Sequence, residues 1–152
     1  MKGDLPHGYW NPKIELMPRA DFRQLQLKRL RHVIAYAWKN SPFYRKLMIR
    51  HGITPADILP LEDFFKRFPS SRREDLDKDQ LENLPFGTRL AVPFENVLRY
   101  HTTSGTTGKP PVRAFATERD WIWGGDCWAA SLYNFGVRPA DVVMVAFGYG
   151  SF

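Results

Sequence analysis

The chain has 152 residues, of which 43% are hydrophobic and 25% are charged, and its formal net charge is +6. These proportions are typical of a globular protein with a core of its own, and they exclude a disordered tail or a fibre. No run approaches the roughly 20 apolar residues of a membrane span, and the single cysteine, Cys127, excludes an internal disulfide and a cysteine-based zinc site, so we expect a cytoplasmic protein without a membrane partner.

The first half of the sequence predicts helices almost throughout. Ser41 followed by Pro42 is typical of a helix start, and Ser70 or Ser71 is expected to cap a later helix. The spacing of apolar residues and these caps predict five helical segments: 19–39, 41–52, 54–57, 61–67 and 72–77.

The second half changes from a helical to an alternating period. Alternation and turn residues predict the following order of strand, strand, helix and strand: 96–102, 112–115, 117–134 and 142–147. Thr117 and Asp120 have the spacing of a capping box at the start of that helix. The last run is wholly apolar, which favours a strand buried on both faces and a sheet with parallel character. Trp121 and Trp128 lie seven residues apart, and we expect them to pack in the core or against further chain.

These elements predict an α/β protein with a mainly helical N-terminal region at 1–90. Residues 91–152 then form the start of an α/β domain. The sequence stops just after the predicted buried strand, where nothing remains to cover the second face of that strand. We therefore expect the chain to be the front part of a longer protein, with its large domain incomplete.

The positive charge belongs to the first third of the chain. Residues 1–50 contain 11 Lys and Arg against three Asp and Glu, whereas residues 51–152 contain 11 against 13. A basic region of this kind is compatible with nucleic-acid binding. The basic residues of 19–39, however, surround a continuous apolar stripe, and no helix-turn-helix signature follows. We expect a packing or homodimer-contact helix and no nucleic-acid partner.

A polar segment at 104–110 joins the first two predicted strands and reads SGTTGKP. Glycines allow backbone N–H groups to converge on a phosphate, hydroxyls donate further hydrogen bonds, and Lys109 supplies a positive charge. A simple Gly/Thr turn with a solvated lysine is the alternative. Four hydroxyls between Thr103 and Thr107, together with two glycines, are more than a turn requires, so the sequence favours phosphate binding.

The segment is not a P-loop. Thr103 stands where that motif requires its first glycine, and Pro110 follows Lys109 where a Ser or Thr must reach magnesium. A P-loop also opens a helix, whereas Pro110-Pro111 continues into an extended segment. Backbone amides, hydroxyls and the lysine must therefore hold the phosphates without a helix N-terminus.

TSGTTGKP resembles the phosphate-binding signature of the adenylate-forming enzymes, which use ATP to turn a carboxylic acid into an acyl-adenylate and then a thioester. Three flanking segments are similar in order and spacing to phenylacetate–CoA ligases: MPRADFRQLQLKRLRHVIAYAWKNSPFYRKLM, LEDFFKRFPSSRREDL and GVRPADVVMVAFGYGSF. The resemblance implies that residues 91–152 begin an AMP-binding domain. It also implies ATP and Mg²⁺ as cofactors, CoA as co-substrate and a small carboxylic acid as substrate.

The resemblance also implies roles for individual residues. Residues of the 104–110 segment would close over the β- and γ-phosphates of ATP: Ser104, Gly105, Thr106, Thr107, Gly108 and Lys109. Lys109 would neutralise charge on the leaving pyrophosphate, and Tyr149 and Gly150 would begin the wall of the acyl pocket. Phe147 stands where the family often has Tyr, and Ser70-Ser71-Arg72 replaces its TTK.

The parts that complete such an active site would lie beyond Phe152: the magnesium-holding acid, the ribose-binding Asp and the catalytic lysine. Residues 1–152 alone are therefore expected to be inactive. The parent protein is expected to be an acid–CoA ligase for phenylacetate or a related aryl acid. Two alternatives stay open, namely transfer of the acyl group to a carrier protein or other acceptor, and a non-catalytic oligomerisation fragment. His7 and His51 have no spaced partners, so no protein-ligated metal site is expected.

Overall fold

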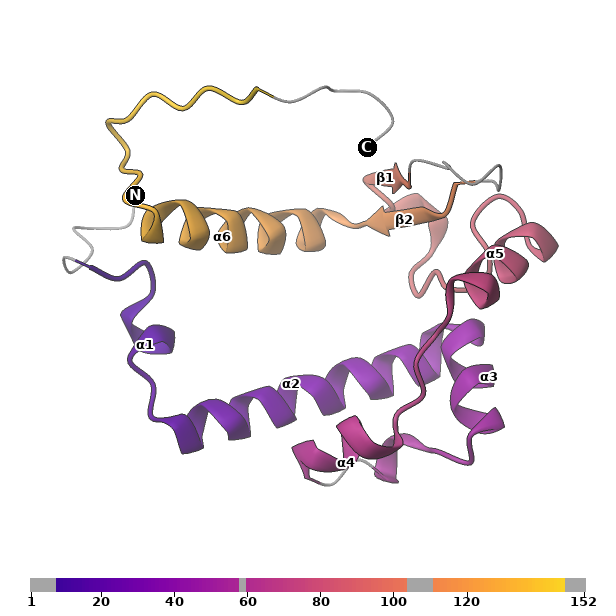
Figure 1. Ribbon diagram of the computed structural model, residues 1–152. Coiled ribbons are helices and arrows are strands. Elements are labelled where there is room, and N and C mark those ends of the chain that lie inside the picture. Colours follow the sequence, from indigo (N-terminus) through magenta and orange to yellow (C-terminus); the bar gives the residue numbers. More distant parts are fainter. Residues whose placement is uncertain (1–7, 58–59, 104–110, 147–152) are drawn as a thin grey trace.

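The computed structural model describes residues 8–57, 60–103 and 111–146. Figure 1 shows two long helices, α2 and α6, on opposite sides of the molecule. Helix α5 and a pair of strands lie at the right-hand side of this view. The elements in chain order are α1 Pro12–Glu15, α2 Arg19–Asn40, α3 Pro42–Arg50, a 3₁₀ turn η1 Pro55–Asp57, α4 Leu61–Arg67, α5 Arg73–Glu82, a 3₁₀ turn η2 Phe94–Asn96, β1 Arg99–Thr102, β2 Arg113–Ala116 and α6 Glu118–Asn134.

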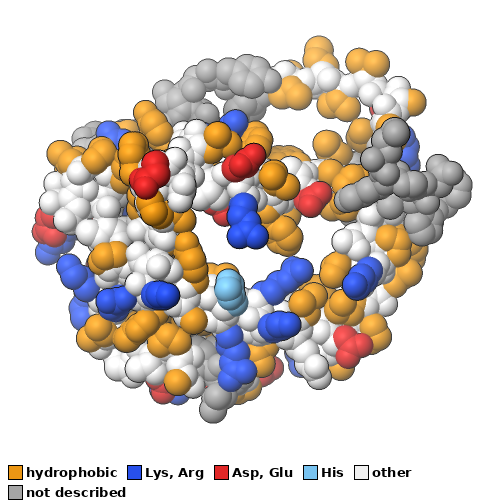
Figure 2. Space-filling model, turned by 180° about the vertical axis from the view of Figure 1, so that it is seen from behind, with side chains coloured by type: hydrophobic (Ala, Val, Ile, Leu, Met, Phe, Trp, Pro, Cys, Tyr) orange, Lys and Arg blue, Asp and Glu red, His pale blue; other side chains and the backbone are white. Residues whose placement is uncertain are grey.

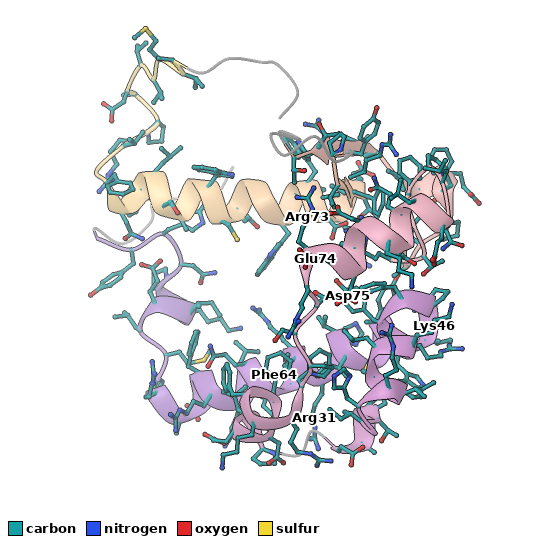
Figure 3. The ribbon with its side chains drawn as sticks, turned by 45° about the vertical axis from the view of Figure 1, so that its right-hand side comes forward. Arg31, Lys46, Phe64, Arg73, Glu74 and Asp75 are labelled. Atoms are coloured by element: carbon teal, nitrogen blue, oxygen red, sulfur yellow. The ribbon has the colours of Figure 1, made fainter. Side chains whose placement is uncertain are left out.

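The hydrophobic core lies where α2, α3 and α4 meet. Ile34, Met48 and Ile53 are buried, and half-buried side chains that include Phe64 pack against them. In Figure 3 the labelled Phe64 and Arg31 lie where α4 runs against α2. The apolar stripe of α2 thus packs inward as expected, although Val33 is 59% exposed. Among the described residues, no helix has both the length and the apolar character needed to cross a membrane.

The predicted side-chain caps are present at the starts of α3 and α6 and absent at the start of α5. The Ser41 hydroxyl accepts a hydrogen bond from the Tyr44 N–H at the start of α3, as predicted. Neither Ser70 nor Ser71 caps α5, because the backbone is still extended at Arg72 and the helix begins at Arg73. The carboxylate of Asp75 instead accepts from the Arg72 N–H at 3.1 Å, so an acidic side chain inside the first turn satisfies this end.

The second half begins as predicted. Strands β1 and β2 pair in antiparallel register from Arg99 opposite Ala116 to Thr102 opposite Arg113. The turn η2 occupies the first part of the run that predicted a strand from residue 96. Helix α6 has the predicted capping box at Thr117, and the chain after it turns through Gly136 with a positive φ of 92°.

The predicted third strand is wrong. Residues 142–146 form no strand among the described residues, and Val142 is 98% exposed. In Figure 1 this segment runs back along α6 as an extended chain. A strand needs a neighbour for its backbone N–H and C=O groups, and an apolar run predicts burial without supplying that neighbour. The expected parallel crossover is therefore absent from the described residues, and the sheet is antiparallel.

The tryptophans of α6 do not pack in a core formed by the described residues. Trp128 is 72% exposed and Trp121 is about half exposed, with the Arg99 guanidinium 3.4 Å from the Trp121 ring centre. Taken together, the chain is a mixed α/β structure with a mainly helical first part and a small two-stranded sheet. The domain boundary near residue 90 stays a prediction.

Candidate phosphate-binding site

The residues predicted to contact nucleotide and acid lie outside the described residues. This applies to Ser104–Lys109 and to Tyr149 and Gly150. The structure describes the residues on both sides of the 104–110 segment, which we call the phosphate loop after its predicted role. Thr103 precedes it and Pro111 follows it, and both are continuous with the two strands, β1 and β2, that carry the loop.

The residues on either side of the phosphate loop are hydrogen-bonded to each other. The Thr103 N–H donates to the Val112 carbonyl oxygen at 3.1 Å. The Val112 N–H donates in return to the Thr103 hydroxyl oxygen at 3.0 Å. This exchange extends the β1–β2 ladder by one pair beyond Thr102 opposite Arg113. The prediction that the loop joins two strands is confirmed, and the pairing is antiparallel.

A side chain from α5 adds a third anchor that the sequence did not reveal. The Gln80 side-chain N–H donates to the Pro111 carbonyl oxygen at 2.9 Å, and the Gln80 side-chain oxygen accepts from the Arg113 N–H at 2.9 Å. Gln80 is only 2% exposed. In Figure 1, α5 lies beside the strands. The two partners follow Gln80 by 31 and 33 residues, so no local pattern could have indicated the contact.

An aromatic cluster also supports the strands. Phe86 lies edge-on to Phe115 of β2 at 4.9 Å between ring centres, and it stacks on Phe94 at 5.2 Å. Tyr100 of β1 contacts the same Phe86 ring at 6.0 Å. Each such pair contributes about 0.5–1.5 kcal/mol beyond the burial of its area. The strands that carry the loop are therefore held both by Gln80 and by this cluster.

A large cavity in the described part of the chain lies away from the loop site. It has a volume of about 1040 Å³ and opens between α2 and the start of α6, with walls that include Tyr36, Phe115 and Trp123. Figure 2 shows the molecule hollowed through its middle on the face seen from behind. Neither Thr103 nor Pro111 lines this cavity. It lies at the far end of β2, away from the loop.

Three further side chains with reactive groups are exposed. His32 on α2 lines this cavity, His101 lies on β1, and Cys127 lies on α6. Among residues 8–57, 60–103 and 111–146, no group of three His, Cys, Asp or Glu side chains is arranged to hold a metal ion. What the described residues of this region contribute is therefore the hydrogen bonds that hold the backbone on either side of the phosphate loop.

Relatives of the chain are found by sequence. No family model matches it. The chain is 39% identical over 143 residues to the phenylacetate-coenzyme A ligase of Thermus thermophilus, a match that covers 94% of this chain and 31% of that ligase. It is 40% identical to the same enzyme of Aromatoleum evansii and 38% identical to that of Escherichia coli, each over 91% of this chain and 30% of the relative. The chain thus spans about 30% of the length of these relatives.

Solved structures match over the same portion. One crystal structure of 2-hydroxyisobutyryl-CoA ligase, in the postadenylation state with 2-HIB-AMP, matches with a TM-score of 0.82 and 34% identity over 91% of this chain and 29% of that one. A second, with 2-HIB-AMP and CoA in the thioesterification state, gives a TM-score of 0.83 and 36% identity. The fold is therefore that of the N-terminal part of an adenylate-forming CoA ligase. Within that class, the sequence of the chain is similar to those of phenylacetate-coenzyme A ligases.

Proposed function

We propose that this chain is the N-terminal part of an ATP-dependent acid–CoA ligase that activates phenylacetate or a related aryl acid. The observation that carries the proposal is the frame of the phosphate loop. A segment of two glycines, three hydroxyls and a lysine stands between two paired strands whose ends are fastened at Thr103 and Val112. The similarity to phenylacetate-coenzyme A ligases over about 90% of the chain supports the assignment.

The proposed roles follow from the chemistry of the loop residues. The backbone amides and hydroxyls of Ser104–Gly108 bind the β- and γ-phosphates of ATP, and Lys109 carries the compensating charge. A carboxylate oxygen of the acid attacks the α-phosphorus, the bond to pyrophosphate breaks, and Lys109 stabilises the charge that develops on the leaving group. The CoA thiolate then attacks the acyl carbon and AMP leaves. Tyr149 and Gly150 begin the wall of the acyl pocket.

The donor set fits a polyphosphate better than it fits magnesium. Mg²⁺ prefers carboxylate and phosphate oxygens in octahedral geometry. The phosphate loop contains no carboxylate, and the described residues contain no acidic cluster that could hold a cation. We therefore assign no residue of this chain to Mg²⁺, whose ligands are then the phosphates and the acid expected beyond Phe152.

The proposal also covers the thiol that accepts the acyl group and the activity of residues 1–152 on their own. We expect residues 1–152 alone to bind nucleotide phosphates without forming a thioester. A carrier-protein thiol in place of CoA would leave the adenylation step unchanged. Supplying CoA and holo-carrier protein separately to the full-length protein with radiolabelled acid distinguishes the two acceptors.

The test is acid-dependent exchange between ATP and pyrophosphate in the full-length protein, across a series of aryl and arylacetic acids. Lys109→Ala is expected to slow exchange about a hundredfold, because it removes a charge aimed at the leaving group. The same substitution at Lys78, an exposed lysine on α5 paired with Glu82 at 3.8 Å, is the matched control and should leave exchange unchanged. Exchange that is unaffected by Lys109→Ala would remove the loop from the mechanism.

A further inference from the structure

The short stretch that leaves the phosphate loop is fixed at every backbone polar group. The Pro111 carbonyl oxygen and the Arg113 N–H are both bonded to the Gln80 side chain. The Val112 N–H and carbonyl are both bonded to Thr103. The Arg113 carbonyl oxygen accepts from the Arg89 guanidinium at 2.9 Å. Proline has no N–H, so no donor or acceptor between the Pro111 and Arg113 carbonyls is left without a partner.

Two side chains in this set come from outside the hairpin: Arg89, which holds one backbone group, and Gln80, which holds two. Its carboxamide presents an N–H to a carbonyl and an oxygen to an N–H, so both ends of the group are used in the only orientation that satisfies both partners. Because the side chain is 2% exposed, water cannot replace it. Its loss would leave two part-buried backbone groups, the Pro111 carbonyl and the Arg113 N–H, without this partner.

The helix that carries Gln80 is itself held in place. Its first turn, labelled in Figure 3 by Arg73, Glu74 and Asp75, is capped by the Asp75 carboxylate. Near its other end, Asp79 accepts two hydrogen bonds from Thr88, at 2.7 Å from the N–H and at 2.6 Å from the hydroxyl. The contact between Gln80 and the strand therefore links one fixed element to another.

We propose that Gln80 is a positioning residue for the nucleotide phosphates, acting by fixing the backbone from which the phosphate loop departs. This inference rests on the proposed function of that loop. Charge-stabilising groups must be held within about 0.5 Å of their productive positions. A loop with one end free to shift would place its amides and Lys109 less accurately against the β- and γ-phosphates. In the proposed function the acid binds at a wall that begins with Tyr149 and Gly150, so the effect of Gln80 is expected on ATP rather than on the acid.

The test compares variants of Gln80 in the full-length protein by ATP–pyrophosphate exchange. Gln80→Met keeps an unbranched side chain of similar size and removes both hydrogen bonds. It is expected to raise the KM for ATP about tenfold and to leave the KM for the acid within about twofold. Gln80→Asn keeps the amide on a shorter arm that cannot reach both partners, and it is expected to raise the KM for ATP by a smaller factor of about three. This milder variant covers the case in which Gln80→Met fails to fold.

Ile34→Val is the control for a general loss of stability, because Ile34 lies in the core among α2, α3 and α4, remote from the strands. It should lower the melting temperature while the KM for ATP stays within about twofold of the unaltered protein. An unchanged KM for ATP in both Gln80 variants would overturn the inference. An equal rise in the KM for ATP in Ile34→Val, compared with a Gln80 variant of the same melting temperature, would also overturn it. An unaltered protein that shows no exchange with any acid would overturn the proposed function and this inference with it.

Discussion

Replacing Asp79 by alanine removes the two hydrogen bonds that Thr88 donates to its carboxylate. The Asp79 carboxylate accepts from the Thr88 N–H at 2.7 Å and from its hydroxyl at 2.6 Å, in a half-buried position. The Thr88 carbonyl in turn accepts from the Ser41 hydroxyl and the Phe43 N–H, each at 3.2 Å. Thr88 is thus the residue at which α5 is joined to the start of α3.

The magnitude follows from these contacts. A hydrogen bond to a charged group contributes about 1.5 kcal/mol at the lower end of its range, which suits a half-buried carboxylate. Two such bonds give about 3 kcal/mol, and alanine recovers roughly 0.6 kcal/mol of helix propensity within α5. The net cost to local stability is therefore about 2 kcal/mol, which corresponds to roughly thirtyfold faster opening.

Amide hydrogen exchange at Thr88 measures this cost directly, because its N–H is one of the two donors. Exchange should be roughly thirtyfold faster in Asp79→Ala under conditions where opening is at equilibrium. Glu82→Ala is the matched control on the same helix. Its ion pair with Lys78 spans 3.8 Å between exposed side chains and contributes less than about 0.5 kcal/mol. Unchanged exchange at Thr88 in Asp79→Ala would refute the reasoning, as would an equal increase in the control.

Three further predictions concern turns and caps. Gly87→Ala should lower stability by about 2 kcal/mol in thermal unfolding, because φ is +75° and the new Cβ would overlap the Asp79 carboxylate; an unchanged melting temperature would contradict this. Thr117→Ala should cost α6 about 1 kcal/mol, seen as faster exchange in its first turn and nowhere in α2. Hydrogen bonds from the Thr54 hydroxyl and then from its N–H lower the pKa of Asp57, so the stability it contributes is present above the ordinary aspartate pKa and is lost as pH falls through the lowered one. Thr54→Val should raise the Asp57 midpoint in a carbon-13 titration, and no change would dismiss the Thr54 hydroxyl as the main cause.

The starts of α3 and α6 were predictable because they are determined by local chemistry. Ser41 with Pro42 and Thr117 with Asp120 satisfy backbone groups only a few residues away, so spacing alone reveals them. The hairpin was predictable for the same reason, since its two strands flank a short polar segment. Thr103 and Val112 pair as that proximity in sequence leads one to expect.

Features that depend on distant partners were not predictable. Gln80 bonds to residues more than 30 positions away, and nothing in the sequence around it indicates an anchor for the loop. The run at 142–146 was interpreted as a buried strand from its apolar composition, yet composition does not specify a pairing partner. Trp121 and Trp128 were expected to pack in the core or against further chain, and their exposure contradicts only the first of these two alternatives.

The central claim is that the phosphate loop binds the β- and γ-phosphates of ATP. It is tested most directly by labelling the glycines and lysines of the full-length protein with nitrogen-15 and following the amides of Gly105, Gly108 and Lys109 during titration with ATP and, separately, with AMP. The account predicts that ATP shifts these three amides and that AMP, which lacks both phosphates, leaves them in place. Equal shifts with the two nucleotides, or none with ATP, would contradict it.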